Sequence, residues 1–161
     1  MREFLINKLF KFSNEPIKFL DLIEANALFN EGMLIDPAKL HFKFKNFNTY
    51  FIYFCLCFCV LMPLLALSHF IFEKIDFHIS ILSSVFVTSA VFICFDIFKI
   101  NIRKVASKRQ ILCAWKIHFA YFEYEKYNLK VNEIYSKAKQ LQIPNSKLEQ
   151  FILENLVKES V

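Results

Sequence analysis

The sequence predicts an all-α integral membrane protein, in which a two-helix transmembrane hairpin carries a small cytoplasmic helical domain built from both termini. Composition is the first observation behind this prediction: 56% of the 161 residues are hydrophobic, 21 are Phe and one is Gly. This chain is too apolar for an ordinary soluble domain. One glycine also excludes phosphate-binding loops, dinucleotide-binding turns and nucleophile elbows, because each needs several glycines at fixed spacing.

Two long apolar runs are the second observation. Residues 49–72 contain no Asp, Glu, Lys or Arg, and residues 77–98 contain one acid, Asp96. As helices these runs reach roughly 33–36 Å, enough to cross a hydrocarbon core of about 30 Å. Residues 73–76 are too few to cross back, so the runs form an antiparallel hairpin. Core helices of this length in a soluble protein normally carry a polar stripe, which neither run has.

The distribution of basic residues is the third observation, and it sets the orientation. Seven Lys and Arg precede the first run, one lies in the turn, and twelve follow the second run. The positive-inside rule then places both termini in the cytoplasm. We therefore expect a multi-pass protein of the cell (inner) membrane, and the Phe, Ile, Lys and Asn bias suggests a bacterial source. The first run lies too far along the chain for a signal peptide, and we expect it to be retained.

Residues 1–48 are predicted to form a cytoplasmic, largely helical region. A short amphipathic helix covers 1–12, and a second helix follows Pro16 and ends near Asn30. Gly32 lies where a helix needs a left-handed C-terminal cap. For 41–45 we favour a helix that continues into the first span, although the alternating Phe and Lys also suit an extended strand.

Residues 99–161 are predicted to form one long helix to about Gln142 and a final helix that folds back as an αα-hairpin. The long helix has apolar residues on two faces, so it needs two packing partners. The N-terminal helix and the final helix, or another subunit, can provide them. We assign a partner-binding stripe to Leu112, Trp115, Phe119, Phe122, Tyr121 and Tyr124.

Few residues suggest chemistry, and we expect no catalytic, cofactor or metal site. Cysteines 55, 57 and 59 are two apart, so on a helix only Cys55 and Cys59 share a face. Cys55 and Cys94 reach similar depths and can be neighbours across the hairpin. His69 and His78 flank the turn and are the weak candidates for a cofactor. Asp96 is the intramembrane acid, and Lys99 at i+3 is its expected ion-pair partner.

Two further patterns indicate contacts. Residues spaced by four on the second span predict a close helix-packing face, and they are Ser80, Ser84 and Thr88. Basic residues directly after this span predict contact with anionic lipid headgroups, and they are Lys99, Arg103, Lys104, Lys108 and Arg109. The net charge of +5 follows from this topology, and we expect no nucleic-acid partner.

Three functions fit these features. The first is a non-enzymatic membrane-anchored adaptor or accessory subunit, whose cytoplasmic helices bind a partner protein or a second copy. The second is a homo-oligomeric channel or transporter, with Glu73 and Asp76 at its outer mouth and Asp96 at its inner gate. The third is a redox or cofactor anchor that uses His69 and His78. No residue set favours an enzyme.

Overall fold

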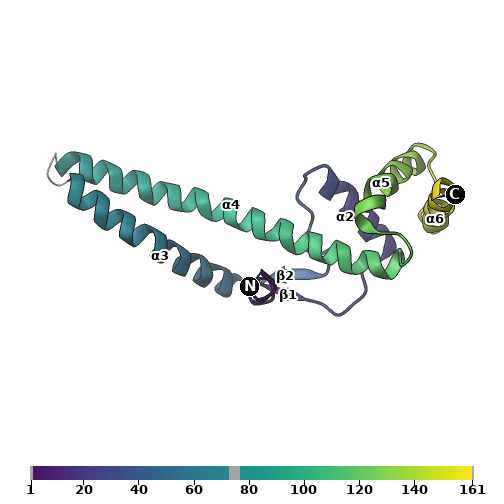
Figure 1. Ribbon diagram of the computed structural model, residues 1–161, viewed down its shortest axis with the longest axis horizontal. Coiled ribbons are helices and arrows are strands. Elements are labelled where there is room, and N and C mark those ends of the chain that lie inside the picture. Colours follow the sequence, from purple (N-terminus) through teal and green to yellow (C-terminus); the bar gives the residue numbers. More distant parts are fainter. Residues whose placement is uncertain (1, 73–76, 161) are drawn as a thin grey trace. The chain divides into compact units, whose positions relative to one another are not determined.

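The computed structural model describes residues 2–72 and 77–160, and it is mostly helical. Within this part of the chain the elements follow in the order α1 (Arg2–Leu9), β1 (Phe10–Phe12), α2 (Phe19–Asn30), β2 (Phe42–Phe44), α3 (Asn46–Phe72), α4 (Phe77–His118), α5 (Tyr124–Gln140) and α6 (Asn145–Ser160) (Figure 1). The predicted acids of the outer turn, Glu73 and Asp76, lie outside the described residues.

The contacts within the chain define two compact units. Unit 1 comprises Met1–Lys11 and Phe44–Ile102, and unit 2 comprises Phe12–Lys43 and Arg103–Val161. Helix α4 belongs to both units, because it continues past the predicted end of the second span to His118.

Unit 1 is built on α3 and α4, which run antiparallel (Figure 1). Both helices are long and apolar enough to cross a membrane, with mean hydropathies of 2.4 and 2.2 over their most apolar windows. The predicted runs 49–72 and 77–98 lie within them. Pro63 lies inside α3.

The short N-terminal elements differ in part from the prediction. The predicted helix over 1–12 ends at Leu9, and the last three residues form β1, which pairs with β2. The predicted helix over 41–45 is therefore wrong. Buried and exposed side chains alternate in this segment, as they do in a strand. Phe42 is buried and Lys43 is exposed, as in β1, where Phe10 is buried and Lys11 is exposed. A period of two suits a strand whose phenylalanines share one face.

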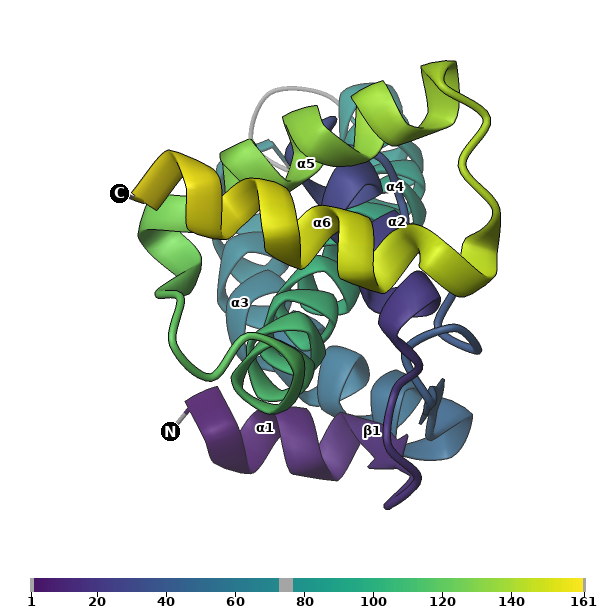
Figure 2. The same cartoon turned by 90° about the vertical axis from the view of Figure 1, so that its right-hand side faces the viewer.

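Unit 2 is a small helical bundle in which α2 packs against α5 and α6, and α5 packs against α6. Figure 2 shows α5 and α6 crossing side by side. The predicted αα-hairpin is confirmed, and its inner positions are buried. These positions are Val131, Ile134, Tyr135 and Ala138 of α5, with Leu148, Ile152 and Leu156 of α6.

The predicted continuous helix from 99 to 142 is wrong, because the chain leaves the helix between His118 and Tyr124. Neither Pro nor Gly lies there. Phe119 is only 2% exposed, and its ring lies 4.4 Å from that of Trp115 and 5.5 Å from that of Phe19. Burial of these rings offsets the helical hydrogen bonds that the break removes.

Left-handed residues close three turns of the chain. Gly32, with φ +75°, follows the end of α2: its amide donates to the Phe29 carbonyl at 3.1 Å, and the Met33 amide donates to the Leu28 carbonyl at 2.9 Å. This is the Schellman arrangement, so the predicted cap is confirmed. His41 and Gln142, both with φ 52°, are the left-handed residues of two further turns.

Replacing Gln142 with glycine is expected to stabilise unit 2 by about 0.5–1 kcal/mol. A non-glycine residue in the left-handed region is strained, and glycine relieves this strain at some cost in chain entropy. Chemical denaturation of the full chain in detergent measures the difference. Glu133→Gly inside α5 is the control and should destabilise by about 1 kcal/mol. A loss of stability in Gln142→Gly would contradict the assigned turn geometry.

Candidate functional site

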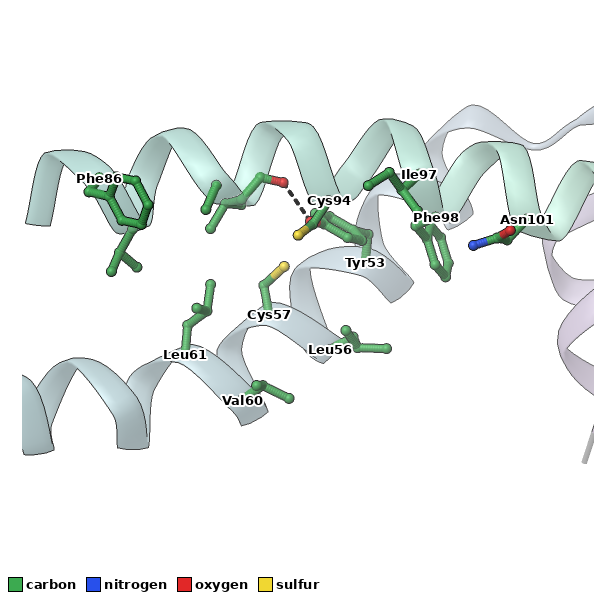
Figure 3. Close-up of a pocket in the computed structure, with 13 residues that line it drawn as sticks. Tyr53, Leu56, Cys57, Val60, Leu61, Phe86, Cys94, Ile97, Phe98 and Asn101 are labelled. Carbon is green, nitrogen blue, oxygen red and sulfur yellow. Dashed lines mark hydrogen bonds between the residues drawn. The ribbon is translucent and has the colours of Figure 1, made fainter. Parts of the chain in front are cut away.

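An apolar cavity of about 470 Å³ lies between α3 and α4 in unit 1. Its lining residues recur every three or four positions on each helix, which places them on the two facing sides. They are Tyr53, Leu56, Cys57, Val60 and Leu61 of α3, with Phe86, Val87, Ala90, Val91, Cys94, Ile97, Phe98 and Asn101 of α4. Figure 3 shows these side chains projecting from both helices.

Tyr53 joins the two helices beside this cavity. Its hydroxyl donates a hydrogen bond of 2.6 Å to the Val91 carbonyl. Its ring centroid lies 4.7 Å from that of Phe95 and 5.4 Å from that of Phe98. Tyr53 is thus 9% exposed although most large side chains near it on α3 are open. A buried tyrosine needs a partner for its hydroxyl, and a backbone carbonyl provides it here.

The cysteine that faces α4 is Cys57. Cys57 and Cys94 both line the cavity (Figure 3), whereas Cys55, the predicted neighbour of Cys94, is not one of its lining residues. Cys57 follows Tyr53 by four residues and so shares its face, while Cys55 is turned away by two residues. That spacing of Tyr53, Cys57 and Leu61 was the available signal in the sequence. Both cysteines are free thiols.

The candidate cofactor ligands do not form a metal cluster. Within 2–72 and 77–160, no three His, Cys, Asp or Glu side chains are grouped to hold an ion. His69 lies in the last turn of α3 and His78 at the start of α4, and both are exposed.

Asp96, the predicted intramembrane acid, has the ion-pair partner expected for it. Asp96 Oδ1 lies 3.3 Å from Lys99 Nζ, at spacing i+3. The Lys99 ammonium also lies 4.8 Å from the centroid of the Phe95 ring. The Asp96 side chain is 72% exposed.

Contacts within the chain already involve three residues of the predicted basic cluster. Besides Lys99, Arg103 donates through Nε to the Ile35 carbonyl at 2.9 Å, and the Arg109 guanidinium lies 4.9 Å from the Phe12 ring centroid. Lys104 and Lys108 are exposed.

The predicted helix-packing face is described only at Thr88. Thr88 is exposed on α4. The side chains of Ser80 and Ser84 lie outside the described residues, and the predicted face stays a prediction.

Three residues of the predicted partner-binding stripe lie in the core of unit 2, so they are covered by the chain itself. Trp115 and Phe119 are each 2% exposed and Tyr124 is 8% exposed. The Trp115 indole Nε1–H donates to the Phe122 carbonyl at 2.7 Å. Its ring meets that of Tyr124 edge-on at 5.1 Å. Burial raises the pKa of the Tyr124 hydroxyl, as expected where the ionised form loses its hydration.

A surface remains where the chain leaves the helix. Tyr121 is 96% exposed and Ile117 is 66% exposed. A cavity of about 550 Å³ lies beside Tyr121, with Leu112, Lys116 and Phe122 among its lining residues. Leu112 and Phe122 are half-buried. We call Ile117, Tyr121 and this cavity the 117–121 surface. The helix break that creates it has no signal in the sequence.

Comparisons with protein-family models, with curated proteins and with solved structures found no match to this chain.

Proposed function

We propose that this chain is a membrane-anchored adaptor or accessory subunit without catalytic activity. In this proposal α3 and α4 cross the cell membrane, both termini lie in the cytoplasm, and unit 2 binds a partner protein or a second copy through the 117–121 surface.

The exposure of α3 and α4 supports the anchoring. Only 6% of the most apolar window of α3 is buried, and 0% of that of α4, whereas core helices of a soluble protein are largely covered by protein. Large apolar side chains are open on both helices, including Phe54 (64% exposed), Phe86 (77%) and Phe92 (70%). An apolar surface of this extent needs lipid or protein as its solvent. This observation carries the anchoring proposal.

The asymmetry of the basic residues supports the orientation. One Lys lies in the short connection between the helices, against seven Lys and Arg before α3 and twelve after the second predicted run. By the positive-inside rule, the two flanks that are rich in Lys and Arg stay in the cytoplasm, and the short connection lies on the opposite side of the membrane.

The 117–121 surface supports the adaptor role. A fully exposed tyrosine beside a hollow with aromatic and charged lining is typical of protein-binding surfaces, where tyrosine supplies apolar area and a polar tip. Lys116, Glu123 and Glu125 line the same hollow, so a partner can gain both apolar and charged contacts.

Site-specific photo-crosslinking tests this role. A benzoylphenylalanine at position 121, in the full chain expressed in bacteria, is expected to give a discrete adduct of higher mass. The control is the same group at position 141, where Leu141 is 67% exposed on unit 2 outside this surface. Mass spectrometry of the adduct distinguishes a second copy from another protein. The absence of an adduct at 121, or equal adducts at both positions, would contradict the proposal.

A further inference from the structure

Helix α1 is fixed against the beginning of α3 in unit 1. The Lys45 ammonium donates to the Asn7 carbonyl at 3.0 Å, and the Asn48 side-chain amide donates to the Lys8 carbonyl at 2.9 Å. The Lys45 backbone amide donates to the Leu9 carbonyl at 2.8 Å. The last carbonyls of α1, which lack partners within the helix, are therefore satisfied by the residues that start α3.

This attachment sets the direction of α1. Figure 2 looks along α3 and shows α1 lengthwise, while Figure 1 shows α3 lengthwise and α1 close to end-on. Helix α1 thus runs crosswise to α3, and the contacts between the two helices hold it at the level where α3 begins. If α3 crosses a bilayer, α1 lies in the plane of the bilayer surface.

One face of α1 packs inward and another is open. Ile6 and Leu9 are 6% and 2% exposed. Phe4 is 66% exposed, and Lys8 one turn later places its ammonium 5.5 Å from the Phe4 ring centroid. A ring and an ammonium at i and i+4 match an interfacial site, where the ring enters the acyl boundary and the charge stays among the headgroups.

The beginning of α3 also carries exposed aromatic side chains. Phe47 is 81% exposed and Tyr50 is 60% exposed, at the depth where membrane proteins carry aromatic belts. Lys11 is also exposed, and residues 2–11 carry three basic residues and one acid. We call Phe4, Lys8, Lys11, Phe47 and Tyr50 the interfacial surface.

We propose that the interfacial surface binds anionic lipid headgroups at the cytoplasmic face, with α1 lying in the plane of the membrane. Two properties favour a lipid surface over a protein partner. Phe47 and Tyr50 belong to α3, the helix whose exposed apolar side chains face lipid in the proposal above, and the excess of basic residues complements anionic phosphate groups. This inference rests on the membrane anchoring proposed above.

Quenching of tryptophan fluorescence by brominated lipids tests the proposal. The full chain carrying Phe4→Trp is reconstituted in vesicles of phosphatidylcholine and phosphatidylglycerol, with bromine on the acyl chains of one lipid at a time. The unaltered chain gives the background quenching of Trp115 fluorescence. We expect brominated phosphatidylglycerol to quench position 4 more strongly, with a preference of about fivefold for each contributing lysine.

Matched charge changes test the role of the lysines. Lys8→Gln with Lys11→Gln is expected to remove the preference for phosphatidylglycerol at position 4. Lys126→Gln with Lys137→Gln removes the same charge from exposed positions of α5. This control should keep the preference for phosphatidylglycerol at position 4. Equal quenching by both lipids in the Phe4→Trp chain would overturn the proposal, as would loss of the preference in the α5 control alone.

A second reporter separates this inference from the anchoring. Phe58, near the middle of α3, is 55% exposed, and Phe58→Trp should be quenched by either brominated lipid. Quenching at 58 without quenching at 4 would overturn the interfacial role of α1 and leave the anchoring intact. The absence of quenching at 58 would contradict the anchoring itself.

Discussion

Replacing Trp115 with alanine is expected to lower the free energy of unfolding of unit 2 by about 3–5 kcal/mol, the usual cost of truncating a buried aromatic residue. Trp115 is 2% exposed and contacts the rings of Phe119 and Tyr124. Its indole Nε1–H also donates a hydrogen bond to the Phe122 carbonyl, so the substitution removes both packing and a hydrogen bond. Hydrogen exchange of α5 and α6 in the full chain measures the loss.

Two further variants separate these contributions. Trp115→Phe keeps most of the apolar volume but leaves the Phe122 carbonyl without the indole, and should cost about 1–3 kcal/mol. Ile117→Ala, two residues away and 66% exposed, should change stability by less than about 0.5 kcal/mol. Equal protection of the α5 amides from hydrogen exchange in Trp115→Ala and in the unaltered chain would show that Trp115 does not hold α5 against α4.

Replacing Asn26 with aspartate is expected to cost about 3 kcal/mol or more at neutral pH. Asn26 is 0% exposed in α2, and its amide donates to the Asn128 carbonyl of α5 at 3.0 Å. The substitution removes that donor and buries a carboxylate without a basic partner. Chemical denaturation followed by circular dichroism measures the difference.

The pH dependence of this loss identifies its cause. Burial raises the pKa of the new carboxyl in the folded state above its unfolded value of about 4. The charge penalty is therefore present above that pH and shrinks as the pH falls toward it, because both states then hold the proton. A loss that is constant between pH 7 and pH 4 would contradict a buried charge as its origin.

Two other asparagine variants complete this test. Asn26→Leu should cost less than Asn26→Asp, because it buries no charge and also removes the Asn26 carbonyl oxygen, which is buried without a hydrogen-bond partner. Asn145→Asp makes the same chemical change at the exposed first residue of α6. It should be neutral or slightly stabilising, because a carboxylate at a helix N-terminus is favourable.

The elements that the sequence predicts well depend on local signals. The two apolar runs lie within α3 and α4 because their length and composition require no tertiary information. Gly32 ends α2 as predicted, because only a left-handed residue closes that turn. The αα-hairpin of α5 and α6 follows from the 3.6-residue periodicity of their buried positions and from the interruption at Pro144.

Elements that depend on tertiary contacts could not be predicted from the sequence. The break after His118 forms because Phe119 is buried against Trp115 and Phe19, and Phe19 belongs to a distant part of the sequence. The pairing of β1 with β2 likewise joins distant segments that periodicity alone leaves open. Both cases overturn a local helix preference through burial of aromatic rings.

The candidate sites show the same division. The ion pair of Asp96 and Lys99 follows from i+3 spacing and is present. The prediction of the partner-binding stripe depended on which aromatic residues the other helices cover, and the sequence does not show this. Trp115, Phe119 and Tyr124 are covered, and Tyr121, on the same short segment, is not.

Labelling of Cys113 tests the proposed membrane topology most directly. Cys113 is exposed on α4 and is the one cysteine outside the two predicted spans. A charged, membrane-impermeant maleimide should label it in inverted vesicles and not in spheroplasts from the same bacteria, with Cys113→Ser as the control. Labelling of Cys113 in intact spheroplasts would contradict a cytoplasmic location for unit 2.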